Sequence, residues 1–321
     1  MTYRPHPRNK AKRAGAKTVR TLDALGLGIM PLDILFTINL FPEPGGKLDA
    51  TSMILQGGGP VPNVMVGLAR FGLKTAVITA VGDDYAGEIG LREIAKDHVR
   101  TDWVIVKRGE ASDTAIGFVE EQSGRRTIAL HRGAWVKPRD VRTDRLPIPR
   151  LLHLDGRDLE ACMKLARWGR KVGAIVTFDI GSMRNDVSPI FPLVDHLIVA
   201  DSYAFPFTGT NSAPEAIGKL SKHCKGTIVV TEGIAGSTGF ENGALTRFRS
   251  FKVTNVDTTG AGDAFHTGYF FALLKGKPMV ERLRLGAATA ALKCTRPGAR
   301  TGIPTLAQVM NFLRKDPEIY A

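Results

Sequence analysis

Short apolar runs alternate with longer segments of mixed character along most of the chain. Six of these runs have the length of a β-strand, and they cover residues 22–30, 76–81, 151–154, 174–180, 196–200 and 226–231. Runs without polar alternation are typical of strands that are buried on both faces of a parallel sheet. Helical patterns at residues 64–71, 264–274, 280–293 and 305–314 complete the alternation. The pattern predicts an α/β domain with helices on both faces of a mostly parallel sheet.

Two further regions have a different pattern, in which apolar and polar residues alternate. Residues 35–55 alternate loosely around Pro42, Pro44 and two glycines, which indicates two short strands joined by a turn. Residues 114–119 and 126–131 indicate a hairpin across the Gln122-Ser123-Gly124 turn. These strands predict a second, smaller sheet.

The glycine-rich turn at residues 257–263 carries the strongest chemical signal. It lies between a strand-like run, residues 248–256, and the apolar helical pattern that follows. Such a turn directs unpaired backbone N–H groups and the positive end of a helix dipole at one point, which favours phosphate. Gly260 and Gly262 allow positive φ and close approach of a ligand. Asp263 either caps the helix or serves as a general base, and the pattern in isolation favours the cap.

Other polar residues follow predicted strands, at the edge of the sheet where ligands bind in such folds. Asp33 comes after the first strand, and Arg157 comes after the strand at residues 151–154. Gly57-Gly58-Gly59 precedes a helix that contains Asn63. Alone, Asp33 is interpreted as a structural turn residue and Arg157 as a plain surface residue, and the glycine run before Asn63 is weak evidence of a site. The loop from Thr231 to Gly236 is equally well a plain turn.

Composition restricts the class of protein. A chain of 321 residues with 43% apolar residues is long enough for one large α/β domain. No run has the length of a membrane-spanning segment, and no segment has the pattern of a secretion signal. The three cysteines are too scattered for a disulfide framework or a zinc site, so we expect a reducing, cytoplasmic environment.

The net charge of +13 is unevenly distributed. Residues 1–20 carry seven Lys or Arg and no acidic residue, so +6 remains for the other 301 residues. The segment has no apolar periodicity and is predicted to be a disordered basic tail. We expect its removal to leave stability and activity unchanged, and we do not expect specific nucleic-acid binding.

The sequence Asp-Thr-Thr-Gly-Ala-Gly-Asp-Ala-Phe at residues 257–265 resembles the C-terminal signature of the ribokinase-like (PfkB) carbohydrate kinases. Gly58-Gly59 through Asn63 to Ala69-Arg70-Phe71-Gly72 resembles the N-terminal signature of the same family. The resemblance spans about residues 22–314. It implies a three-layer α/β/α sandwich with a small β-sheet lid, formed by a domain at residues 21–314 and followed by a short tail at 315–321.

The resemblance also implies roles for individual residues. Asp263 would be the catalytic base, and the N–H groups of Gly260, Ala261 and Gly262 would form the anion hole. The remaining implied contacts are with the substrate (Asp33, Gly58, Gly59, Asn63 and Arg157) and with the nucleotide (Thr231, Gly233, Gly236, Gly260 and Gly262). Arg157 would meet an anion, either a phosphate of ATP or an acidic group of the substrate.

The implied cofactors are ATP and Mg²⁺. A monovalent cation such as K⁺ is left open, held by backbone oxygens at Asp257 and Thr259 and in the segment after residue 291. Many members carry a Glu that supports the magnesium network where this chain has Ala204, so that function is not transferred. The segment at residues 291–304 looks most similar to the ketohexokinase and sulfofructose-kinase branch. A homodimer formed through the lid is also left open.

The predicted function is ATP-dependent phosphorylation of a primary hydroxyl of a small sugar or sugar derivative, such as a fructose-like ketose or sulfofructose. A nucleoside kinase is an alternative within the family, for which Phe36, Phe41 and Phe118 would offer base-stacking surfaces. A catalytically silent sugar or nucleotide sensor is an alternative from another class, although an intact Asp263 argues against it.

Overall fold

The computed structural model describes residues 21–123, 126–182 and 186–315. The basic segment at residues 1–20, Gly124 of the predicted hairpin turn and the last six residues lie outside the described part.

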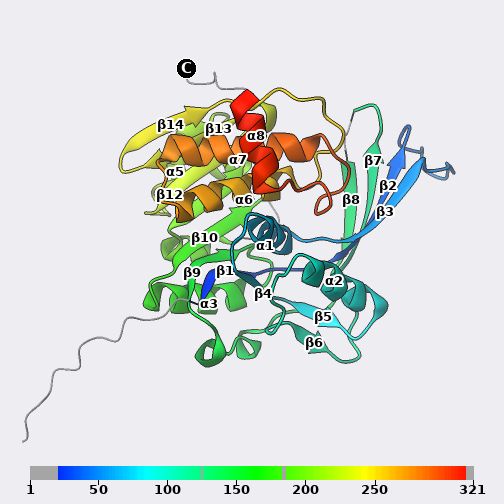
Figure 1. Cartoon of the computed structure of the whole chain (residues 1–321), viewed down its shortest axis with the longest axis horizontal. Coiled ribbons are helices and arrows are strands. Elements are labelled where there is room, and N and C mark those ends of the chain that lie inside the picture. Colours follow the sequence, from blue (N-terminus) through cyan, green and yellow to red (C-terminus); the bar gives the residue numbers. More distant parts are fainter. Residues whose placement is uncertain (1–20, 124–125, 183–185, 316–321) are drawn as a thin grey trace, which may run out of the picture.

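The described chain is built around one sheet of eight strands in the order β14-β13-β12-β11-β10-β9-β1-β4 (Figure 1). Six strands are parallel: β1 (Leu22–Leu27), β4 (Thr75–Ile78), β9 (Pro149–Leu154), β10 (Ile175–Ile180), β11 (His196–Ala200) and β12 (Thr227–Thr231). Two antiparallel strands, β13 (Ser237–Glu241) and β14 (Ala244–Phe248), extend one edge. The mostly parallel sheet predicted from the apolar runs is confirmed.

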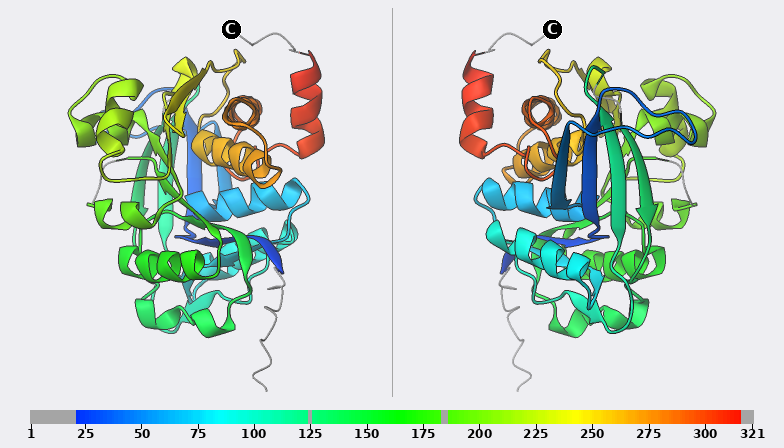
Figure 2. Two further views of the ribbon diagram at one scale, coloured as in Figure 1. Left: turned by 90° about the vertical axis from the view of Figure 1, so that its left-hand side faces the viewer. Right: turned by 90° about the vertical axis from the view of Figure 1, so that its right-hand side faces the viewer.

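Helices cover both faces of this sheet (Figure 2). One face packs against α3 (Leu159–Lys171), α4 (Asp201–Thr208) and α5 (Ala213–Leu220). The other packs against α1 (Pro60–Arg70), α2 (Tyr85–Lys96), α6 (Ala261–Leu274), α7 (Met279–Cys294) and α8 (Leu306–Lys315). Neighbouring strand residues such as Leu151 and Leu152 belong to the two opposite core clusters. The fold is therefore the predicted three-layer sandwich.

The strand order reverses beside β1, which pairs with β4 on one side and with β9 on the other. The chain first moves from β1 to β4 and then returns to β9, β10, β11 and β12 in turn. In open α/β sheets the crevice beyond the carboxyl ends of the strands at such a reversal is where ligands bind. The segments that follow β1 and β9 are thus the expected walls of a binding site.

A smaller sheet of four strands stands to one side of the main sheet in the order β3-β2-β7-β8 (Figure 1). Its strands are β2 (Leu32–Ile38), β3 (Ser52–Gly57), β7 (Thr114–Glu120) and β8 (Arg126–His131). The register places Phe36 opposite Met53 and Phe118, on the face shared with Leu55 and Ile116. The opposite face carries Asp33, Ala115 and Leu130. A third sheet pairs β5 (Ala80–Gly82) with β6 (Ile105–Lys107), and short 3₁₀ helices lie at Pro138–Asp140, Thr143–Arg145, Ser188–Leu193 and Gly233–Ala235.

Three local predictions were wrong. The run at residues 76–81 forms two strands, β4 and β5, rather than one. Asp33 lies within β2 of the small sheet rather than in a turn. Residues 249–256 form no strand, because Phe251 packs into the core against Phe248 and Phe312 instead of pairing along a sheet edge. The glycine-rich turn at residues 257–263 therefore follows an irregular segment, which connects β14 to α6.

Candidate active site

The three consecutive glycines that begin at the last residue of β3 make room for charged side chains. A Cβ at Gly57 would lie 2.2 Å from the Arg300 guanidinium, and one at Gly58 would lie 2.1 Å from the Asp33 carboxylate. Gly59 has φ +94°, and a Cβ there would lie 2.0 Å from the carbonyl oxygen of Ile29. Glycine is required here because the backbone lies against the buried guanidinium group of Arg300 and the buried carboxylate of Asp33, which leaves no room for a side chain.

Close packing of α1 against α6 brings Asn63 and Asp263 together. A Cβ at Gly67 would lie 2.3 Å from Oγ1 of Thr267, so the two helices approach where Gly67 removes the side chain. One turn earlier on both helices, Asn63 Nδ2 donates a hydrogen bond of 2.7 Å to Asp263 Oδ2. The cap residue of α6 is Gly260, so Asp263 does not serve as the helix cap that the isolated pattern favoured.

The groups around Asp263 have opposite effects on its pKa. Burial and the neighbouring Asp179 raise the pKa of Asp263 to about 6, and the hydrogen bond from Asn63 and the proximity of His266 and Arg126 oppose that rise. A carboxylate with a pKa near 6 is largely ionised at neutral pH and remains a stronger base than an ordinary aspartate. The site therefore offers a proton acceptor that is matched to neutral conditions.

Asp33 and Asp263 line the same cavity, of about 510 Å³, together with Asn63, Gly59 and Arg157. Gly58 does not line it, and its carbonyl oxygen instead accepts a hydrogen bond of 2.8 Å from Arg300. Burial raises the pKa of Asp33 to about 7, and Arg300 opposes the rise. We call this space, at the carboxyl ends of β1 and β9, the acceptor cavity.

The acceptor cavity contains residues that the sequence analysis did not select. Asp155 directly follows β9, and Asp179 lies one residue before the end of β10. Burial raises the pKa of each side chain to about 7. Asp155 accepts hydrogen bonds of 3.0 Å from the backbone N–H groups of Ile29 and Arg157, so it fixes the ends of β1 and β9 together. An acidic residue at the carboxyl end of a buried strand is the signal that could have revealed both aspartates.

Arginines from separate segments face the same space. Arg126 begins β8 in the small sheet, and Arg132 and Arg157 lie in loops. Arg132 donates to Asp158 at 2.9 Å and lies 3.3 Å from Asp113, with its guanidinium over the half-exposed ring of Trp135. The cavity thus combines carboxylates with fixed cations and one aromatic surface.

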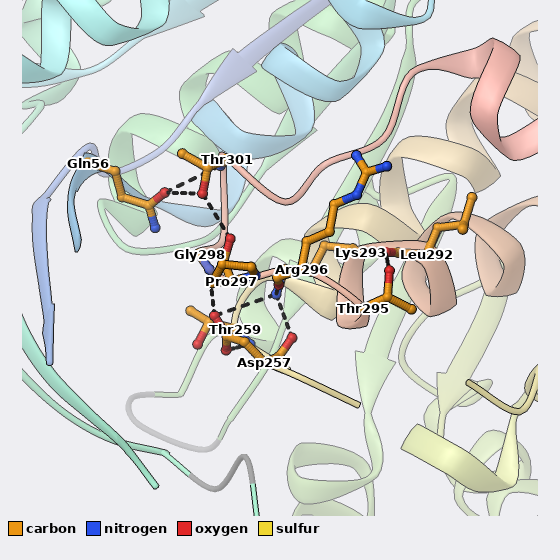
Figure 3. A network of polar contacts seen from close by, with 10 residues as sticks. All are labelled: Gln56, Asp257, Thr259, Leu292, Lys293, Thr295, Arg296, Pro297, Gly298 and Thr301. Atoms are coloured by element: carbon orange, nitrogen blue, oxygen red, sulfur yellow. Dashed lines mark hydrogen bonds and ion pairs between the residues drawn. The ribbon is translucent and has the colours of Figure 1, made fainter. Parts of the chain in front are cut away.

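The turn before α6 is held by Asp257 (Figure 3). Its Oδ1 accepts from the N–H of Thr259 and its Oδ2 accepts from the N–H of Gly298, both at 2.7 Å. Gly260 has φ +77°, as predicted, whereas Gly262 is helical, so the prediction of positive φ was wrong there. A Cβ on Gly262 would meet nothing within 4 Å, which shows that the space before the helix N-terminus is open.

A second cavity, of about 910 Å³, lies on the other side of this turn. The predicted nucleotide residues Thr231, Gly233 and Gly236 line it, and so do Ala261 and Gly262. Its remaining wall includes Phe251, Val253 and the small residues Ala287, Ala290 and Ala291 of α7. We call it the nucleotide cleft. Gly262 lines both cavities, so the N-terminus of α6 lies where they meet.

The comparisons with known proteins agree with this arrangement. The model of the pfkB family of carbohydrate kinases matches residues 27–306. The chain belongs to this family. It is 28% identical to ribokinase of Haemophilus influenzae over 89% of this chain and 97% of that protein. It is 25% identical to a nucleoside kinase of Methanothermobacter thermautotrophicus, covering 88% of this chain and 92% of the relative. It is 26% identical to 5-dehydro-2-deoxygluconokinase of Clostridium perfringens, covering 82% and 85%.

Solved structures support the same fold. Arabidopsis thaliana ribokinase, complexed with ribose and ATP, superimposes with a TM-score of 0.79 at 23% identity, covering 91% of this chain and 99% of that one. An E. coli protein in complex with ATP and Mg²⁺ superimposes with a TM-score of 0.80 at 20% identity, covering 92% and 99%. These structures show the ribokinase fold, and membership of the pfkB family makes the chain an ATP-dependent carbohydrate kinase.

The residues present fit ATP, and they lack the magnesium-supporting Glu that many members of the family carry. The open space beside Gly262 and the size of the nucleotide cleft fit ATP. Ala204, in α4, is fully buried in the core and offers no ligand for magnesium. Within the described residues no cluster of three metal-ligating side chains exists. At kinase sites Mg²⁺ usually keeps several waters and binds substrate phosphates together with one or two carboxylates.

Two other features complete the description. All three cysteines are free thiols, and Cys162 and Cys224 are buried. None of the helices in the described ranges is long and apolar enough to cross a membrane.

Proposed function

We propose that this kinase transfers the γ-phosphoryl group of ATP to a primary hydroxyl of a small sugar or sugar derivative, with Asp263 as the general base. One observation carries the proposal. Asp263 lies in the acceptor cavity, held by Asn63, directly after the residue that lines both cavities. A hydroxyl beside Asp263 is therefore adjacent to the place where a phosphoryl group would rest.

The chemistry follows from the residues at this junction. Asp263 accepts the proton of the hydroxyl as that oxygen attacks phosphorus. The backbone N–H groups of Gly260, Ala261 and Gly262, with the dipole of α6, stabilise the charge that develops on the phosphoryl oxygens. ATP supplies the phosphoryl group and Mg²⁺ neutralises part of its charge. Because no side chain forms a covalent bond, positioning and electrostatics provide most of the rate.

The acceptor is held by the groups that line its cavity. Asp33 accepts hydrogen bonds from hydroxyls of the substrate, and the amide of Asn63 accepts or donates them. Gly59 lets the substrate approach the backbone. Arg157, with Arg126 and Arg132, favours an acceptor that carries an acidic group as well as hydroxyls. This is compatible with sulfofructose, and also with the sugar acid named in the deoxygluconokinase relatives. The ketohexokinase and sulfofructose-kinase branch stays a prediction.

The nucleoside alternative is supported by a relative of that name. Two of its three predicted base-stacking residues, Phe36 and Phe118, stack on each other with ring centroids 6.0 Å apart, on the face of the small sheet that points away from Asp33. They are therefore unable to meet a base in the acceptor cavity. Trp135 is the aromatic residue in that lining, which leaves less support for a nucleoside than for a sugar.

The small sheet is proposed to act as a lid over a cytoplasmic kinase domain of residues 21–314. Its inner face lines the acceptor cavity, so closure would exclude water from the transferring phosphoryl group. Its outer face exposes Met53, Leu55 and Ile116, which supports the predicted homodimer through the lid.

The test is a panel of acceptors assayed for ADP release. Neutral ketoses and aldoses, sugar acids, sulfonated sugars, sugar phosphates and nucleosides are compared with wild-type protein, with the Asp263→Asn variant as the matched blank. We expect acceptor-dependent ADP release with one or more sugars and none above the blank with nucleosides. ADP release with nucleosides alone would favour the alternative, and none with any acceptor would favour the sensor.

A further inference from the structure

Lys293, in the last turn of α7, is completely buried, with 0% of its side chain exposed. Lysine is almost never buried to this extent unless its ammonium group is paired. Its Nζ donates to the carbonyl oxygen of Asp257 at 2.6 Å and to that of Arg296 at 3.5 Å. The same nitrogen lies 3.8 Å from the Asp257 carboxylate (Figure 3). The ammonium is thus surrounded by oxygens from two chain segments that are distant in the sequence.

Those segments support the anion-binding turn. Asp257 precedes the turn and binds the N–H of Thr259 on one side and the N–H of Gly298 on the other. The segment after α7 is anchored in turn, because Gln56 of β3 accepts hydrogen bonds from Thr301. Lys293 therefore sits at the point where the turn before α6, the end of α7 and the segment at residues 296–301 are joined.

The carbonyl oxygen of Asp257 is a predicted ligand of a monovalent cation, together with that of Thr259 and with carbonyl oxygens in the segment after residue 291, which includes Arg296. The fit of such an ion is poor here for two physical reasons. The carbonyl oxygen of Asp257 is already taken by an ammonium group, which is close to K⁺ in size and equal in charge. A second cation beside it would meet electrostatic repulsion. The lysine side chain is also tightly enclosed, since none of it is exposed and a Cβ on Gly302 would lie 3.0 Å from its Cε.

We propose that the Lys293 ammonium group replaces the monovalent cation in this protein, so that the anion-binding turn keeps its shape without K⁺. Charge balance supports the assignment, because the buried cation faces the buried carboxylate of Asp257. Removal of water lowers the pKa of Lys293, and the Asp257 carboxylate opposes this effect. The prediction of a K⁺ site at Asp257 and Thr259 is accordingly replaced by an internal cation.

The test compares full-length wild-type protein in KCl, NaCl and choline chloride at equal ionic strength. The readouts are the melting temperature and the affinity for a non-hydrolysable ATP analogue with Mg²⁺. We expect both to be the same in the three salts. A saturable rise of the melting temperature or the affinity in KCl over choline chloride would show that K⁺ binds, and would overturn the proposal. Neither readout requires an acceptor, so failure of the proposed function would leave this result intact.

Two substitutions sharpen the test, with exposed Lys222→Met as the matched control. Lys293→Met keeps the length of the side chain and removes the charge, and we expect a lower melting temperature and weaker analogue binding than in the control. Lys293→Ala opens space for an ion, so KCl should restore part of both losses and choline chloride should not. A Lys293→Met variant that matches the control would contradict the proposal. If Lys293→Ala fails to fold, the salt comparison on the wild type still decides.

Discussion

The two cavities that meet at Gly262 differ in the side chains that they offer to a ligand. The acceptor cavity is lined by charged side chains, including Asp33, Asp179, Asp263 and Arg157. The nucleotide cleft is lined by small and apolar residues and by three basic side chains, Arg247, Arg249 and Lys252. A substitution in the first cavity is expected to remove a specific hydrogen bond, whereas a substitution in the second removes one apolar contact or one of several positive charges. We therefore expect a single substitution to have a larger effect on acceptor binding than on nucleotide binding.

The largest expected effect comes from Asp263→Asn. The amide keeps the size and can still accept the hydrogen bond from Asn63, but it is unable to take a proton. Turnover should fall by about 10²–10⁴-fold, the usual contribution of a general base. Affinity for an ATP analogue, measured by calorimetry, should be unchanged. Turnover close to that of the wild type would remove Asp263 from the mechanism.

A smaller effect is expected for acceptor binding when Asp33→Asn and Asn63→Ala are compared. A hydrogen bond to a charged group contributes about 1.5–3 kcal/mol and a neutral one about 0.5–1.5 kcal/mol. Asn retains a neutral acceptor, so at pH 8 the KM for the sugar should rise about tenfold in Asp33→Asn, and by somewhat less in Asn63→Ala. The KM for ATP serves as the internal control. An equal rise for ATP would contradict the separation of the two cavities.

The nucleotide cleft should respond weakly to Ile234→Ala. Ile234 is 98% exposed and lines the cleft, so it is free to pack against the flat base of a bound nucleotide. Loss of that apolar contact should raise the KM for ATP about two- to fivefold and leave the KM for the acceptor unaltered. Initial-rate kinetics with each substrate varied in turn separate these outcomes, and a change in acceptor KM alone would refute the assignment.

The pH dependence of stability should show the cost of burying the carboxylates. The pKa of Asp179 is raised from 3.8 to about 7, so the folded state favours the neutral form. The stability that the neutral carboxyl group of Asp179 contributes is fully present below pH 3.8 and is lost as the pH rises through 7. Asp179→Asn, which stays neutral, should be more stable than wild type at pH 8, and the difference should vanish near pH 4. Denaturant unfolding at both pH values is the measurement, and a constant difference would contradict the shift.

The sequence predicted the fold and the central residues because their signals are local. Buried parallel strands read as apolar runs, and Asp263 and Asn63 lie in short motifs with fixed spacing. The contact between them depends on Gly67, whose role appears only when α1 and α6 are packed together. The pattern of residues within each helix does not show where the two helices will approach each other.

The residues that were missed act through long-range contacts. Arg126 reaches the acceptor cavity from the small sheet, and Arg300 reaches Asn63 across 237 positions of sequence. Lys293 stands in an alanine-rich helix and reads as an ordinary helical lysine. Its position is informative only after the end of α7 is placed beside Asp257.

The central claim is that ATP binds with its γ-phosphoryl group at the N-terminus of α6, where the two cavities meet. A crystal structure of the protein with a non-hydrolysable ATP analogue and Mg²⁺ tests it directly and needs no knowledge of the acceptor. We predict the base beside Ala290 and Ile234, and the γ-phosphoryl group within hydrogen-bonding distance of the Gly260–Gly262 backbone and facing Asp263. A γ-phosphoryl group bound away from this turn, or separated from Asp263 by the protein, would contradict the account.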